Sequence, residues 1–71
     1  MRQKTKLHDA YYAVFPMLEL KKITRAEAAK ALGLSQRTFD DKVLGYSDFT
    51  LSQARIISSL LDAPQAEIFL T

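Results

Sequence analysis

Two neighbouring polar residues, Gln36 and Arg37, stand at the start of a helix that the sequence predicts over residues 36–44. A glutamine side chain can form two hydrogen bonds with adenine N6 and N7, and an arginine can do the same with guanine O6 and N7. Asp41 follows one turn along the helix, where its carboxylate could accept a hydrogen bond from the N4 amine of cytosine. This pattern predicts a helix that contacts base edges in the major groove of DNA.

The segment 24–45 has to position these side chains, and its pattern predicts two short helices joined by a tight turn. Thr24 and Glu27 have the spacing of a capping box, which starts a helix over about residues 25–32. Gly33 then ends this helix, because the residue after a helix often adopts a positive φ that glycine takes without strain.

The second helix of this segment has its own start and stop signals. Ser35 is expected to cap it. Phe39 and Val43, four residues apart, are expected to face the core. Gly45 is expected to end the helix.

The order of small and apolar residues in this segment resembles the helix-turn-helix of the Cro/CI type, the XRE family of phage and bacterial regulators. Ala29 matches the small residue of the family's first helix, and Gly33 matches the glycine of its turn. Phe39 matches the apolar residue of the second helix, and Gly45 matches the glycine that closes it.

The family's next loop and fourth helix are similar to YSDFTLSQARIISSLL in this chain, so the resemblance covers about residues 15–69. It implies an all-α fold, a compact five-helix bundle of the lambda-repressor-like DNA-binding class. It also implies sequence-specific binding of double-stranded operator DNA by a transcriptional regulator, most like the short Cro-like repressors of phages and prophages. The chain of 71 residues leaves no room for the second domain of a complete CI-like repressor, which favours a short Cro-like regulator. The alternative is that the chain is the N-terminal domain of a longer repressor.

Contacts with phosphate position a DNA-binding domain without specifying sequence. The resemblance implies such a contact for Arg25, near the start of the first helix. Further candidates for phosphate contact lie on the second helix, in the loop after it and at the next helix start: Thr38, Lys42, Tyr46, Ser47 and Thr50. A helix N-terminus binds anions through its free amides, so Thr50 is expected to combine phosphate contact with capping.

The charge of the chain is uneven, although its net value is only +2. Residues 1–39 have eight Lys and Arg against three Asp and Glu, a net charge of +5, and residues 40–71 have two against five, a net charge of −3. This asymmetry favours a surface that meets a polyanion. The polar and basic residues 1–6, MRQKTK, are expected to form a flexible arm along the DNA; the alternative is a frayed terminus.

Apolar side chains at helical spacing predict a first helix from about Leu7 to Lys21. Pro16 lies inside this span, where proline removes a backbone hydrogen bond and clashes with the preceding turn. We expect one helix with a kink or brief break; the alternative is a shorter helix that begins near Phe15 with Pro16 in its first position.

A second capping box and a proline predict where the last two helices begin. Thr50 and Gln53 predict the start of a fourth helix, and Pro64 precedes a short fifth one. The fourth helix has apolar residues at a 3.6-residue period: Leu51, Ala54, Ile57, Leu60 and Leu61.

A homodimer is expected, because one helix contacts too few base pairs for useful specificity. The candidate interface is the apolar end of the chain, Ile68, Phe69 and Leu70. The alternative for these residues is packing within their own subunit.

Composition excludes several other classes of protein. The 71 residues form one domain, 1–71, without cysteine and with a single histidine, so no disulfide framework, metal site or cofactor site is expected. That histidine, His8, is expected at the surface. No nucleophile with a partnered base stands out, so the chain is not expected to be an enzyme. No secretory signal or long apolar run is present. The absence of cysteine favours a reducing cytoplasm, and the resemblance implies that of a bacterium.

Asp40 and Asp41 oppose the DNA-binding interpretation, because two acids on the second helix would repel phosphate. Both could instead pair with Lys42 or Arg37. The alternative function is a helix-turn-helix module that binds another protein, since a fold alone does not fix function.

Overall fold

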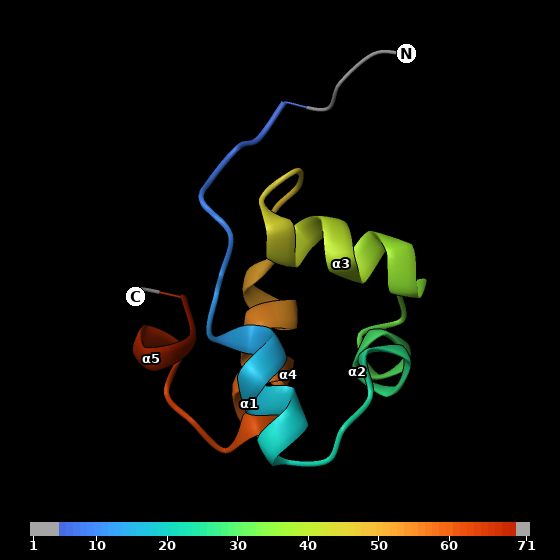
Figure 1. Ribbon diagram of the computed structural model, residues 1–71, viewed down its shortest axis with the longest axis vertical. Helices are drawn as coiled ribbons and strands as arrows, with labels where there is room; N and C mark the ends of the chain where they lie inside the picture. The colour runs from blue at the N-terminus through green and yellow to red at the C-terminus, as the bar shows by residue number, and fades with distance from the viewer. Residues whose placement is uncertain (1–4, 70–71) are drawn as a thin grey trace.

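The computed structural model describes residues 5–69, which form five α-helices and no strand. The predicted all-α class is therefore confirmed. The helices are α1 (Val14–Leu20), α2 (Arg25–Ala31), α3 (Gln36–Leu44), α4 (Leu51–Leu61) and α5 (Gln65–Phe69). In Figure 1, α1 overlies α4, with α2 and α3 to one side and α5 to the other.

Side-chain caps set the starts of three helices where the sequence predicted them. Thr24 Oγ1 accepts a hydrogen bond from the amide of Glu27 at 3.0 Å, and Glu27 Oε1 accepts one from the amide of Thr24 at 3.2 Å. Thr50 and Gln53 form the same pair of bonds at 3.1 and 3.0 Å. Ser35 caps α3 by accepting from the amide of Thr38. Each cap satisfies amides that a helix start leaves without a partner.

The first helix is shorter than the sequence indicated. The helix expected from about Leu7 to Lys21, with a kink or brief break at Pro16, is wrong, and the alternative that begins near Phe15 is close to the structure, in which α1 starts at Val14. Pro16 is the third residue of α1 and lies in the first turn, where the missing amide hydrogen costs no intrahelical bond. Leu7, assigned to the apolar face of that helix, is 69% exposed because it lies outside the helix.

Residues 6–11, which we call the N-terminal strap, lie beside the C-terminal end of α3 instead (Figure 1). The amide of Leu7 donates to the carbonyl oxygen of Gly45 at 2.7 Å, and the amide of Tyr11 donates to that of Val43 at 2.9 Å. These bonds hold the last turn of α3 and the loop that follows it.

Every helix contributes to the core, which lies between α1, α2, α3, α4 and α5. Its nine buried side chains are Val14, Leu18, Ala28, Ala29, Phe39, Val43, Ile57, Leu61 and Ile68. Phe39 has no exposed surface and fixes α3 to the other helices. Leu51, expected in the apolar face of α4, is 63% exposed, because six residues at 3.6 per turn separate its face from that of Ile57.

Gly45 is the residue at which backbone geometry and packing both demand glycine. Its φ is +104°, and a Cβ atom there would overlap the carbonyl oxygen of His8 in the strap. Gly33 also has a positive φ, +73°, but a Cβ there would have no atom within 4 Å. Both turn glycines therefore have a positive φ, but only Gly45 has no room for a Cβ atom.

We expect Gly45→Ala to lower the free energy of unfolding by about 3 kcal/mol or more, because backbone strain adds to overpacking. Gly33→Ala should cost only about 1–2 kcal/mol, from backbone strain alone. Urea unfolding of both variants measures the difference. Equal losses would show that the strap does not pack against Gly45.

Candidate nucleic-acid interface

A short turn sets the relative placement of α2 and α3. The amide of Gly33 donates to the carbonyl oxygen of Lys30 at 3.0 Å, and the amide of Leu34 donates to that of Ala29 at 2.9 Å. Figure 1 views α2 along its axis and α3 from the side, so the two helices cross. Buried Ala28 and Ala29 have the small side chains that let another helix approach closely.

The first turn of α3 presents Gln36 and Arg37 to solvent, as the sequence predicted. Ser35 fixes this turn through two bonds with Thr38: its Oγ accepts from the Thr38 amide at 3.2 Å and donates to the Thr38 hydroxyl at 2.9 Å. Because buried Phe39 anchors α3 to the core, the exposed amide and guanidinium project from a fixed helix.

Asp41 is partly exposed, one turn beyond Arg37 and on the side of α3 away from Phe39 and Val43. Its carbonyl oxygen accepts from the amides of Gly45 and Tyr46 at 3.1 and 2.9 Å, which closes the helix end. Its contact with a base stays a prediction.

Asp40 does not lie on that outer side. Its Oδ2 is 3.5 Å from Nη1 of Arg25 on α2, and the Arg25 guanidinium lies 5.2 Å from the centre of the Phe15 ring on α1. The suggested pairing of Asp40 with Lys42 or Arg37 is therefore wrong. The local sequence could not indicate the pair of Arg25 and Asp40, because 15 residues separate them.

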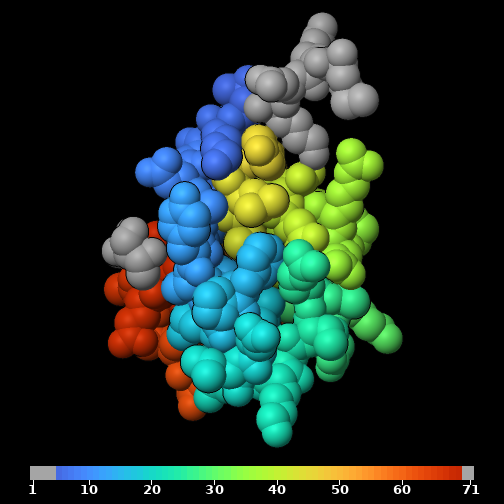
Figure 2. Space-filling model, in the orientation of Figure 1, coloured from blue at the N-terminus to red at the C-terminus, as the bar shows by residue number. Residues whose placement is uncertain are grey.

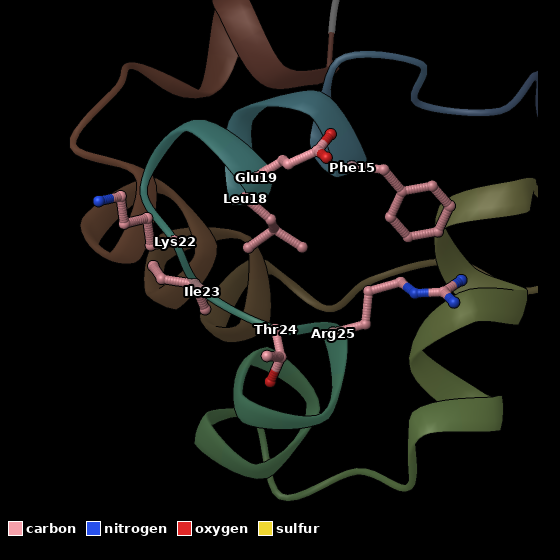
Figure 3. Close-up of a pocket in the computed structure, with 7 residues that line it drawn as sticks. All are labelled: Phe15, Leu18, Glu19, Lys22, Ile23, Thr24 and Arg25. Atoms are coloured by element: carbon pink, nitrogen blue, oxygen red, sulfur yellow. The ribbon is translucent and has the colours of Figure 1, made fainter.

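Arg25 thus links three helices. Its side chain is 50% exposed and that of Asp40 is 23% exposed, so water still reaches the guanidinium. Figure 3 shows the Arg25 side chain extending beside the Phe15 ring. Its predicted contact with phosphate would use the exposed part of a side chain that is already oriented by two neighbours.

An open hollow of about 480 Å³ lies beside this cluster, between α1 and the start of α2 (Figure 3). Its lining consists of Phe15, Leu18, Glu19, Lys22, Ile23, Thr24 and Arg25. Glu19 is the one carboxylate in that lining, and Lys22 and Arg25 supply two cations.

The loop after α3 is braced by side chains for which the sequence predicted phosphate contacts. Lys42 Nζ donates to the carbonyl oxygen of Asp48 at 2.6 Å. The amide of Thr50 donates to Gln53 Oε1, so a phosphate would have to replace this bond. The phosphate contacts of Lys42 and Thr50, like those of Tyr46 and Ser47, stay predictions.

His8 is not the solvated surface residue that the sequence suggested. Its side chain is 18% exposed, and its ring stacks on that of Tyr11 with centroids 4.3 Å apart. Nε2 lies 3.0 Å from the carbonyl oxygen of Ser47, and Nδ1 lies 2.7 Å from that of Asp9. No local signal could place His8 beside Ser47, because 39 residues separate them.

Tyr11 completes the contact between the strap and this loop. Its hydroxyl donates to Asp48 Oδ1 at 2.9 Å. Burial, the hydrogen bond to Asp48 and the charge of that carboxylate together raise the pKa of Tyr11 to about 12, and burial has the largest effect. The bond requires a protonated phenol.

The structure describes two of the three candidate dimer residues at the chain end, Ile68 and Phe69. Ile68 is fully buried in its own subunit, so its assignment to a dimer interface is wrong and the alternative holds. Phe69 packs edge-on against Tyr11 at a centroid distance of 4.9 Å, also within the subunit. Leu70 lies outside the described residues.

Residues 5–69 contain no group of three or more His, Cys, Asp or Glu side chains that could hold a metal ion. Within the same range, none of the helices has the length and apolar character that crossing a lipid bilayer requires.

We expect the stability of the fold to fall as the pH rises from 10 towards 12. An unfolded tyrosine loses its proton near pH 10 and folded Tyr11 near pH 12, so the unfolded state releases the proton first over this interval. Chemical unfolding at several pH values measures the slope. Tyr11→Phe should have a shallower slope in this window, and an unchanged slope would contradict the assignment.

The Arg25–Asp40 pair should contribute about 0.5–1 kcal/mol, a value limited by the exposure of Arg25. A double-mutant cycle with Arg25→Gln and Asp40→Asn measures this coupling by chemical unfolding. If the two single effects simply add in the double variant, the side chains do not interact in solution.

Comparison with known proteins matched this chain to no family model, no curated protein and no solved structure. The function proposed for it therefore rests on its own residues and their arrangement.

Proposed function

We propose that this protein is a transcriptional regulator, a repressor of the short Cro-like kind, that binds operator DNA through a helix-turn-helix made of α2 and α3. The observation that supports it most is the exposed first turn of α3. Gln36 and Arg37 project there from a helix that the Ser35 cap and buried Phe39 hold in place. Side chains at this end of a recognition helix contact base edges in the major groove.

The position of Asp40 removes one objection to this function. Its carboxylate faces Arg25 on α2, so the negative charge of Asp40 is partly balanced within the protein. Asp41 is then the acidic side chain on the outer side of α3, where it would accept from a cytosine amine and disfavour other bases. The net charge of +5 over residues 1–39 supplies attraction to the phosphate backbone.

We propose that the protein binds its operator as a homodimer. One α3 helix spans few base pairs, and two copies related by a two-fold axis would contact half-sites roughly 34 Å apart. Since Ile68 is fully buried within the subunit, the dimer contact would use other side chains.

Selection from random duplex DNA tests the function. A palindromic motif bound far more tightly than random DNA, with affinity that falls steeply with salt, is the expected result. Failure to enrich any motif, with only weak binding to every sequence, would favour the alternative of a protein-binding module.

On the selected site, Arg37→Ala should cost about 1–3 kcal/mol of binding free energy and relax the base preference at one position. Arg55→Ala is the matched control, since Arg55 is also an exposed arginine but lies on α4. Fluorescence anisotropy on specific and random duplexes measures both. Equal losses on the two duplexes would make Arg37 a phosphate contact rather than a base contact.

A further inference from the structure

We propose that Lys6 is a phosphate-binding residue and that His8 is the positioning residue that holds it beside the loop 45–48. This inference rests on the proposed function for its ligand, the phosphate backbone of duplex DNA. It assigns a role to the N-terminal strap, a segment that the sequence placed partly in a flexible arm and partly in a helix.

The backbone of the strap is docked on α3 at both ends. The Leu7 amide donates to Gly45, and the Tyr11 amide donates to Val43, at 2.7 and 2.9 Å. The absence of a Cβ atom on Gly45 lets the His8 carbonyl approach its backbone. Figure 2 shows the blue strap lying against the yellow segment that follows α3.

The His8 ring joins the strap to the loop through a side chain. Nε2 lies 3.0 Å from the Ser47 carbonyl oxygen, so this nitrogen donates across the gap between the two segments. The Tyr11 ring stacks on the His8 ring, and the Tyr11 hydroxyl donates to the Asp48 carboxylate. Ring stacking and a hydrogen bond together fix the direction in which the strap leaves α3.

Lys6 is the next charged residue before this anchor. Its Nζ lies 5.9 Å from the centre of the Tyr46 ring, within the range of a cation–π contact, while the side chain remains exposed. The ammonium is therefore held at the loop that contains Tyr46 and Ser47, two of the predicted phosphate contacts.

Charges of both signs lie at this edge, where the 62% exposed Asp48 side chain stands beside His8 and Lys6 stands over Tyr46. The Asp48 carboxylate, the acidic group nearest the anchor, accepts from the Tyr11 hydroxyl and from the Phe49 amide at 2.8 Å. The Nζ of partly buried Lys42 donates to the Asp48 carbonyl at 2.6 Å and braces the loop. Lys6 is thus the cation that this edge presents outwards from the strap.

Anisotropy titrations with a mixed-sequence duplex over a range of salt concentrations test the role of Lys6. Lys6→Gln should reduce the slope of log affinity against log salt by about 0.9, the value for one lost phosphate contact on duplex DNA. Lys21→Gln is the matched control, because Lys21 is an exposed lysine at the C-cap of α1. Figure 1 shows the C-terminal end of α1 far from the strap. An equal effect of both variants would overturn the assignment, since it would reflect only net charge.

If His8 positions Lys6, substitutions at the two residues should have non-additive effects on the salt dependence of DNA binding. A general loss of stability would not produce this non-additivity. His8→Ala should reduce the same slope, and adding Lys6→Gln to it should have little further effect, because the lysine is no longer held at the loop. Additive effects of the two substitutions would overturn the role of His8.

Amide hydrogen exchange on the protein without DNA separates this inference from the proposed function. His8→Ala should speed exchange at the Leu7 amide about tenfold, through loss of the contact that supports its bond to Gly45, while Lys6→Gln should not. If the parent chain shows no salt-dependent DNA binding, the proposed function and the role of Lys6 both fail, and unchanged Leu7 exchange would separately overturn the anchor at His8.

Discussion

The close approach of two backbones at Gly45 is the constraint on which the candidate interface depends. The His8 carbonyl occupies the space that a side chain at position 45 would need, and the Leu7 amide bonds to the carbonyl of Gly45 itself. This contact joins the N-terminal strap to the last turn of α3 and to the loop that follows it. The first turn of α3, which is proposed to meet DNA, is held separately by the Ser35 cap and by buried Phe39.

Side-chain contacts between helices then determine which charges reach solvent. Arg25 turns Asp40 towards α2 and stacks on Phe15, so an acid that seemed to oppose DNA binding contributes to the packing of α1, α2 and α3. Arg37 is exposed on the first turn of α3, where its guanidinium faces solvent. The outer surface is accordingly less acidic than a helix with two adjacent aspartates would suggest.

Aromatic rings link the N-terminal strap and α5 to the loop that follows α3. Tyr11, Phe49 and Phe69 form a cluster with centroid distances of 4.9 to 6.1 Å, and Phe39 meets Phe49 at 6.0 Å. The short α5 is held by this cluster and by buried Ile68. Ile68 is thus fully buried within its own subunit, while the Phe69 ring is only partly buried beside Tyr11.

The sequence by itself determined the local structure: Thr24, Ser35 and Thr50 start three helices, and Gly33 and Gly45 end two of them, because capping and positive φ depend on neighbours along the chain. It also indicated which face of α3 is exposed, through the spacing of Phe39 and Val43. Only the tertiary structure decided where residues 6–11 lie, which partner Asp40 takes and what His8 contacts. Those outcomes depend on groups distant in sequence, whose meeting is set by packing of the whole core and not by any local pattern.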